Sequence, residues 1–339
     1  MVSLGILIEF PSVSDGRPPT DPAALPTVPH IIAMPRTTIL ASALALAASA
    51  ISVRTLDAQT SHGEKATLGG RSVVIWRPAS APGTRAPLVI FSHGFGGCAT
   101  QSTFLTEALA NRGYFVVAPQ HRDARCGGVQ QQSGRGARSR PQEPFQNPEA
   151  WNDRTFVDRA DDVRAVLDAI AHDRDLAARV DVGRIALAGH SLGGYTVVGL
   201  AGAWASWKLP NVKAVLALSP YIQPFVRHQT LGQLAAPVMY QGGTIDFGIT
   251  PFIERSGGAY EVSPRPKYFV DFAGAGHFAW TDLRSSVHDR IDEYAIAFLD
   301  HYVRGTAASP TLTSSGTGVF ILRYDSELGT SAKESPRRR

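Results

Sequence analysis

The chain has 339 residues, of which 44% are hydrophobic and 18% are charged. This composition excludes an intrinsically disordered chain, a collagen and a coiled coil. The net charge of +4 comes from 33 basic and 29 acidic residues, so the surface carries both signs and we expect no nucleic-acid partner. Two cysteines are too few for a disulfide-rich scaffold or a four-cysteine zinc site.

The N-terminal segment has the layout of a leader rather than of a folded domain. Residues 34–58 begin with Met-Pro-Arg, continue as an uncharged, alanine-rich apolar run and end in small residues, which is typical of a secretory signal peptide. The run is at the lower limit of length for spanning a bilayer, so we expect no permanent membrane anchor. We expect cleavage after Ala58 or Ala50 and a secreted or periplasmic protein. Residues 1–33 hold six prolines and no helical or strand pattern, and we expect them to be disordered or to precede the true start at Met34.

Short apolar runs alternate with helical patterns over residues 65–305, which we expect to form one folded domain. The runs that predict strands are Arg71–Trp76, Pro87–Ser92, Tyr114–Ala118, Arg184–Ala188, Lys213–Leu218, Pro237–Gln241 and Lys267–Phe272. The helical patterns are Thr103–Asn111, Thr155–His172 and Arg284–Val303. Most of the strands are continuously apolar, as strands buried on both faces of a parallel sheet are. The alternation predicts a three-layer α/β sandwich, in which a mostly parallel central sheet has helices on both faces.

Two segments depart from this alternation. Residues 126–150 are polar and glycine-rich and are too long for a plain connection, which predicts a loop insertion that binds a ligand or moves. Residues 306–339 are rich in Ser, Thr and Gly, and we expect one extra edge strand at Val319–Leu322 or a loose tail.

A buried strand, a glycine-rich turn and an apolar helical pattern follow one another around Ser191. The turn reads Gly-His-Ser-Leu-Gly-Gly from Gly189 to Gly194, which is the G-x-S-x-G motif directly after the predicted strand Arg184–Ala188. Side chains at Gly189 and Gly193 would collide with the neighbouring strand and helix. The pattern places the Ser191 hydroxyl above the carboxyl edge of the sheet, with a helix N-terminus that favours developing negative charge. We therefore predict that Ser191 is a nucleophile.

A serine nucleophile needs a base, and the base needs an orienting carboxylate. In a fold of this kind the acid and then the histidine follow the serine along the chain. His277 lies in a loop of small residues just after the strand Lys267–Phe272, and Asp246 follows the strand Pro237–Gln241. These positions predict a triad of Ser191, His277 and Asp246. The weaker alternatives lie inside a strand, after the histidine or in the last helix: Asp271, Asp282, His288 and Asp289.

Attack of a serine on a carbonyl carbon gives a tetrahedral intermediate, and the negative charge on its oxygen needs hydrogen-bond donors. One predicted donor is the backbone N–H of Leu192, the residue after the nucleophile. The other is the N–H of Phe95, in the glycine-rich loop that follows the strand Pro87–Ser92. His93, in the same loop, is expected to hold the loop rather than to act as a second base.

Four motifs together resemble the bacterial predicted dienelactone hydrolases of the α/β-hydrolase superfamily. They are His93–Gly97, Val117–Asp123, Asp158–Val163 and Gly189–Gly194. That group is related to platelet-activating-factor acetylhydrolases and, more distantly, to cutinase-like polyester hydrolases, and the likeness covers roughly residues 65–305. The resemblance implies an α/β-hydrolase fold and a serine esterase that uses no metal or other cofactor. Dienelactone hydrolases proper have a cysteine where this chain has Ser191, so the group's name does not give the substrate.

The resemblance also implies residues that bind the substrate. The polyester hydrolases carry an aromatic side chain where Phe95 stands, and a tryptophan wall near the position of Tyr221. The resemblance therefore implies that Phe95 and Tyr221 hold an acyl group or an aromatic ring. The alternative is that both side chains are ordinary packing residues.

The two cysteines follow the carboxyl ends of neighbouring predicted strands. Cys98 comes after the Phe95 loop and Cys126 after the next strand. In an oxidising compartment we expect a disulfide between them that braces the site entrance, with two separate thiols as the alternative. Such a bond stabilises the fold by about 3 kcal/mol if it is unstrained.

The sequence thus predicts a secreted serine hydrolase that cleaves small-molecule or polymeric carboxylic esters through an acyl-enzyme. Short or soluble esters are favoured, because residues 126–150 are polar and lack the apolar face of an interfacial lid. The alternatives are a lipase with residues 126–150 as its lid, a polyester hydrolase and a non-catalytic binding module. The complete triad argues against a binding module.

Overall fold

A computed structural model describes residues 63–79, 83–125, 145–284 and 286–331. The predicted signal peptide at residues 34–58 and the segment before it lie outside the described residues. Cys126, most of the 126–150 insertion and the last eight residues, 332–339, lie outside them as well. The predictions made for those segments therefore stay predictions.

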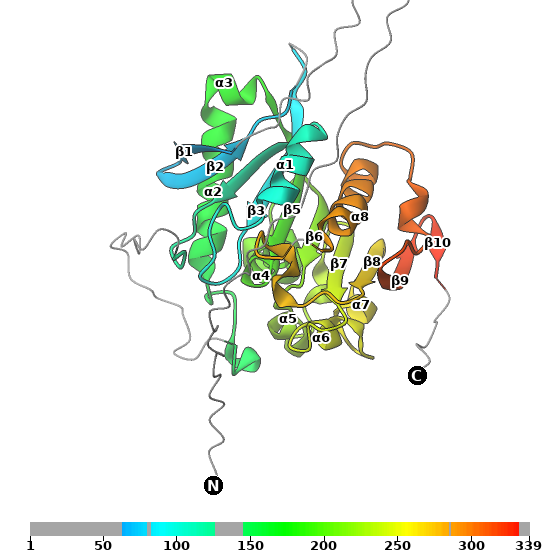
Figure 1. Cartoon of the computed structure of the whole chain (residues 1–339). Coiled ribbons are helices and arrows are strands. Elements are labelled where there is room, and N and C mark those ends of the chain that lie inside the picture. The colour runs from blue at the N-terminus through cyan, green and yellow to red at the C-terminus, as the bar shows by residue number, and fades with distance from the viewer. Residues whose placement is uncertain (1–62, 80–82, 126–144, 285, 332–339) are drawn as a thin grey trace, which may run out of the picture. The chain divides into compact units, whose positions relative to one another are not determined.

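One sheet of ten strands forms the centre of the described chain, in the order β1-β2-β4-β3-β5-β6-β7-β8-β9-β10 (Figure 1). The six central strands, from β4 to β8 in that order, are parallel, and β1, β2, β9 and β10 pair antiparallel at the two ends. The strands are β1 (Glu64–Leu68), β2 (Arg71–Trp76), β3 (Ala86–Ser92), β4 (Phe115–Pro119), β5 (Val180–His190), β6 (Val212–Leu218), β7 (Val238–Gly243), β8 (Lys267–Phe272), β9 (Val319–Ser326) and β10 (Gly329–Thr330). The predicted mostly parallel sheet is confirmed.

Helices cover both faces of the sheet. The α-helices are α1 (Thr103–Asn111), α2 (Val157–His172), α3 (Arg174–Ala177), α4 (Leu192–Val198), α5 (Gln223–Arg227), α6 (Thr250–Glu254), α7 (Ala259–Val262) and α8 (His288–Tyr302). Short 3₁₀ segments are Pro148–Ala150, Ala205–Trp207, Leu231–Gln233, His277–Trp280 and Pro310–Leu312, and Gly199–Ala203 is a π-helical segment. Helices α1 and α8 lie side by side on one face (Figure 1), and α2 and α4 to α7 pack on the other. This is the predicted three-layer sandwich.

Alternation along the buried strands divides the core into two layers. In β3 all seven residues are buried, with Leu88 and Ile90 facing one layer and Val89 and Phe91 facing the other. Since both faces are covered, such a strand must be apolar throughout. On α2, residues Ala160, Val163, Val166 and Ile170 recur at helical spacing and are buried against the sheet.

The strands at the two ends depart most from the sequence predictions. No strand was predicted at β1, because Glu64–Leu68 is largely exposed and has no apolar run. Val319–Leu322 was predicted as an edge strand, but β9 extends to Ser326 and lies between β8 and β10. Among the described residues, no helix combines the length and the apolarity that crossing a membrane requires.

Candidate active site

Ser191 occupies a sharp turn between strand β5 and helix α4. Its φ of +56° lies in the left-handed region that non-glycine residues rarely adopt. A Cβ at Gly193 would overlap the carbonyl oxygen of Ser92, and one at Gly189 would overlap the carbonyl of Gly193. The two glycines predicted from the motif are therefore required by close backbone contacts, which hold Ser191 at the end of β5.

The imidazole of His277 lies within hydrogen-bond distance of this serine. His277 opens the 3₁₀ segment that follows β8, and its Nε2 is 3.0 Å from the Oγ of Ser191. Such a distance suits proton transfer between a hydroxyl and a general base. The structure thus brings together two side chains that lie 86 positions apart in the sequence.

Asp246 is on the far side of the imidazole, and a serine stands between them. The Oδ1 of Asp246 is 3.4 Å from the Nδ1 of His277. The Oγ of Ser219 is closer to both groups, at 2.8 Å from that nitrogen and 2.5 Å from the Oδ2 of Asp246. Ser219 was not among the site residues predicted from the sequence. The signal was its position directly after β6, the strand that separates β5 from β7 in the sheet.

The four residues that were the weaker alternatives for the acid and the base have other contacts or positions. Asp282 caps helix α1, because its carboxylate accepts the N–H groups of Thr103 and Phe104 at 3.0 and 3.2 Å. The ring of His288 stacks on that of Phe104 at 3.5 Å. Asp271 is buried within β8, and burial, with the nearby charges of Glu254 and Asp246, raises its pKa to about 7. Asp289 lies in the first turn of α8.

A chain of hydrogen bonds links the Phe95 loop to the His277 segment. The side chain of Gln101 accepts the N–H of Gly94 at 2.9 Å and donates to the Nδ1 of His190 at 3.0 Å. The Nε2–H of His190 donates to the carbonyl oxygen of His277 at 2.8 Å. Burial, together with the neighbouring His277, lowers the pKa of His190 to about 3. The neutral imidazole that results is the form that can accept one of these bonds and donate the other.

The two predicted oxyanion donors lie next to different parts of the site: Phe95 lines the cavity that Ser191 also lines, and Leu192 directly follows Ser191 in the chain. Leu192 is the first residue of α4, and Phe95 lies in the loop after β3. Neither backbone N–H donates to an acceptor among the described residues. Their role as oxyanion donors stays a prediction.

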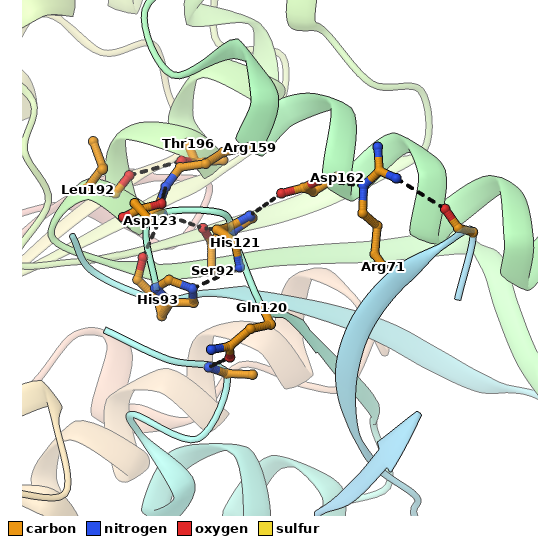
Figure 2. A network of polar contacts seen from close by, with 12 residues as sticks. Arg71, Ser92, His93, Gln120, His121, Asp123, Arg159, Asp162, Leu192 and Thr196 are labelled. Atoms are coloured by element: carbon orange, nitrogen blue, oxygen red, sulfur yellow. Dashed lines mark hydrogen bonds and ion pairs between the residues drawn. The ribbon is translucent and has the colours of Figure 1, made fainter. Parts of the chain in front are cut away.

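A fully buried arginine on α2 holds the Phe95 loop in place (Figure 2). The guanidinium of Arg159 donates to the carbonyl oxygens of His93 and Gly94 at 2.7 and 3.1 Å. It also forms a two-bond ion pair with Asp123, at 3.0 and 2.8 Å, and Asp123 accepts the N–H of Gly96 at 3.2 Å. Burial alone would raise the pKa of Asp123, but the charge and hydrogen bonds of Arg159 outweigh it and hold the pKa well below its usual range.

Figure 2 also shows a second set of hydrogen-bonded Ser, His and Asp side chains, next to His93. The Oγ of Ser92 is 2.9 Å from the Nε2 of His121, whose Nδ1 is 3.0 Å from Asp162, which in turn pairs with Arg71. Ser92, His121 and Asp162 are all buried, so no substrate reaches them. The N–H of His121 donates to the ring of His93 at 3.1 Å. Ser92, His121 and Asp162 therefore support the Phe95 loop through His93, the residue that was expected to hold this loop.

Ser191 and His277 open into a cavity of about 920 Å³. Phe95 and Tyr221 line it, together with Phe145, which meets both rings edge to face at 5.5 and 4.8 Å. Phe95 is partly exposed, whereas Tyr221 is buried against Trp151. The cavity is large enough for a drug-sized ligand.

Four of the side chains that line this cavity are apolar and exposed to solvent. Phe247 and Leu283 are 76% and 79% exposed, and Ile245 and Phe278 are more than half exposed. All four line the cavity. We call these four residues the apolar rim.

The remaining site predictions concern the cysteines and metals. The disulfide predicted between Cys98 and Cys126 stays a prediction, since Cys126 lies outside the described residues. Within the ranges that the structure describes, no group of three His, Cys, Asp or Glu side chains is arranged to hold a metal ion.

Comparisons with known proteins agree with this architecture. A platelet-activating factor acetylhydrolase of Cavia porcellus is 27% identical over 148 residues, which cover 36% of this chain and 33% of that protein. Cutinase 2 of Thermobifida cellulosilytica is 28% identical over 149 residues, which cover 43% of this chain and 52% of that protein. A cutinase of Thermobifida fusca is also 28% identical over 149 residues, covering 43% of this chain and 42% of that protein.

The matches therefore span about a third to a half of the length of these relatives. They agree with the resemblance to acetylhydrolases and cutinases that the motifs indicated. A family model described as the alpha/beta hydrolase family matches residues 89–327, a longer part of the chain that begins within β3 and ends just after β9. The chain belongs to the alpha/beta hydrolase family.

Proposed function

We propose that the protein is a serine hydrolase that cleaves carboxylic esters through an acyl-enzyme. The observation that carries the proposal is the 3.0 Å contact between the Ser191 hydroxyl and the His277 imidazole at the surface of a cavity of about 920 Å³. The similarity to an acetylhydrolase and to cutinases supports ester substrates. We propose no metal or other cofactor for the reaction.

The reaction proceeds by two acyl transfers. Ser191 Oγ attacks the ester carbonyl carbon while its proton moves to the Nε2 of His277, and Asp246 stabilises the imidazolium. The N–H groups of Phe95 and Leu192 bind the oxyanion. The carbon–oxygen bond to the alcohol breaks as His277 returns the proton to the alcohol. Water then repeats the sequence on the acyl-enzyme and releases the acid.

The proposal predicts that the active protein carries its nucleophile at residue 191. The purified protein should hydrolyse p-nitrophenyl esters, with rates that peak at short acyl chains between acetyl and palmitoyl. A fluorophosphonate should inactivate it, because an activated serine attacks phosphorus as it attacks a carbonyl. Fluoride leaves, and the phosphonyl group stays on the Ser191 oxygen, where its mass is found on the peptide that contains Ser191. Full hydrolytic activity with the label on another residue would disprove the assignment of Ser191.

The apolar rim favours a second candidate, the hydrolysis of esters held in an aggregate or a polymer. Exposed apolar patches on a soluble domain mark sites of interaction with other apolar surfaces. The rim residues come from the segments after β7 and β8, and they line the same cavity as Ser191. An enzyme of this kind would be a lipase or a polyester hydrolase rather than an esterase for soluble substrates.

Polar substitutions in the rim separate the two candidates. Phe247→Ser with Phe278→Ser should lower the rate on a polyester suspension by about tenfold or more, since burying one such ring contributes about 1.5–3 kcal/mol. The rate on dissolved p-nitrophenyl acetate should change less than twofold. Phe320→Ser is the matched control, because Phe320 is 56% exposed but does not line the cavity. Equal losses on both substrates would favour the esterase for soluble substrates.

The location and the disulfide belong to the same proposal. Residues 34–58 follow the pattern of a signal peptide, which supports a secreted or periplasmic protein. Such compartments are oxidising and would allow Cys98 and Cys126 to form a bond beside the cavity, which Cys98 lines.

A further inference from the structure

We propose that Ser219 is a positioning residue for acyl transfer, whose hydroxyl connects the carboxylate of Asp246 to the imidazole of His277. The inference rests on the proposed function and adds a fourth side chain to the predicted triad. It concerns how the base is oriented and kept in the required tautomer, and not a contact with the substrate.

The distances favour the serine over a direct bond. The Oγ of Ser219 is 2.8 Å from the Nδ1 of His277, whereas the nearest oxygen of Asp246 is 3.4 Å from it. The normal range for a nitrogen–oxygen hydrogen bond ends at about 3.2 Å. The imidazole therefore has its better partner in Ser219, and the carboxylate acts chiefly through the 2.5 Å bond that it shares with the same hydroxyl.

Hydrogen-bond chemistry fixes the direction of each bond. An ionised carboxylate only accepts, so the single proton of the Ser219 hydroxyl is donated to Asp246. The Ser219 oxygen must then accept from the Nδ1–H of His277. Because a neutral imidazole has one proton, its Nε2 is left as an acceptor facing Ser191. Ser219 thus selects the tautomer that can take the proton of Ser191.

The backbone holds Ser219 in an unfavourable conformation to place this hydroxyl. Its φ is +41°, in the left-handed region where a residue with a Cβ is disfavoured. Its N–H donates to the carbonyl of Gln241 in β7 at 2.8 Å, and two residues later the N–H of Tyr221 donates to the carbonyl of Ser191 at 2.9 Å. The turn is therefore tied both to the strand that precedes Asp246 and to the nucleophile itself.

The same bonds strengthen during the reaction. When Ser191 gives its proton to the Nε2 of His277, the positive charge on the ring makes the Nδ1–H a better donor to Ser219. The polarised hydroxyl then donates more strongly to the carboxylate of Asp246. Ser219 keeps its own proton throughout, so no further acid or base is needed.

Two substitutions remove the hydroxyl with different effects on the backbone. Ser219→Ala keeps the Cβ, whereas Ser219→Gly suits a positive φ better. We expect both to lower kcat for p-nitrophenyl acetate by about 10- to 100-fold, the range for a hydrogen bond to a charged group. KM should not change, because Ser219 does not line the cavity. Loss of activity in Ser219→Ala with full activity in Ser219→Gly would overturn the role of the hydroxyl.

A double-mutant cycle tests whether Ser219 acts through Asp246. In an Asp246→Asn background, Ser219→Ala should lower kcat by less than about threefold, since residues that act as a unit are not additive. A second full loss in that background would overturn the connection, as would unchanged kcat in the single variant Ser219→Ala. Ser263→Ala, at a buried serine outside the site, should retain parental activity.

The proposed function is checked separately from this inference. If the parent hydrolyses the ester and Ser191→Ala does not, the hydrolase assignment holds, and the Ser219 variants then test only the connection. An inactive but folded parent would instead refute the proposed function itself.

Discussion

Replacing Ser191 with alanine is expected to lower kcat for a p-nitrophenyl ester by about 10⁴- to 10⁶-fold. The methyl group cannot attack the carbonyl, and only the proposed oxyanion donors and substrate binding remain to assist water. The 3.0 Å contact between the serine Oγ and His277 disappears, but the packing of the turn does not depend on that hydroxyl. The melting temperature should therefore stay within a few degrees of the parent, and steady-state kinetics on the purified variant measure the loss.

His277→Ala should show a loss of similar size, because the serine without its base is a poor nucleophile. The double variant Ser191→Ala/His277→Ala should be no slower than either single variant, since the two residues act as one unit. Losses that multiply in the double variant would contradict a shared role. Thr311→Ala, at a half-buried threonine on the 3₁₀ segment Pro310–Leu312 that does not line the cavity, is a control expected to keep full activity.

The sequence was sufficient to predict the centre of the fold because the parallel strands are buried on both faces. Their apolar runs are visible without knowledge of the neighbouring strands, and the prediction Lys267–Phe272 matches the parallel strand β8 residue for residue. The prediction Arg71–Trp76 matches β2, which is antiparallel but also largely buried, equally well. The G-x-S-x-G turn was equally visible, since glycine is required at positions where a Cβ would clash with nearby backbone atoms. Edge strand β1 lacks such a run, because most of its side chains face solvent.

Residues that act through other residues were harder to predict. A serine after a strand is common, and only the order of β5, β6 and β7 in the sheet brings Ser219 between His277 and Asp246. Arg159 is in the first turn of helix α2, among several charged residues, and the sequence alone does not distinguish its burial from the exposure of Asp161 two residues later. Its charge partner in the interior is Asp123, which lies 36 positions earlier in the sequence and is brought next to it only by the fold.

The buried pair of Arg159 and Asp123 yields the second large prediction. Arg159→Met should lower the free energy of unfolding at pH 7 by about 3–5 kcal/mol, because it leaves the carboxylate of Asp123 buried without its charge partner. In the parent, the depressed pKa of Asp123 stabilises the fold above the unfolded value of about 3.9. In the variant, burial is no longer opposed by the charge and hydrogen bonds of Arg159, so the pKa of Asp123 rises relative to the parent. The deficit should therefore grow as the pH increases from 3 to 7, as urea unfolding would measure.

A compensating variant separates stability from catalysis. In Arg159→Met/Asp123→Asn the buried charge is gone, so at least half of the lost stability should return. Activity should not return, because the carbonyls of His93 and Gly94 still lack the donors that hold the loop. Displacing the Phe95 N–H should leave kcat about 10²-fold below the parent, the typical result of losing one oxyanion donor. Activity that recovers together with stability would show that the ion pair supports only the fold. Activity that stays low in a stable protein would instead show that Arg159 orients the Phe95 loop for catalysis.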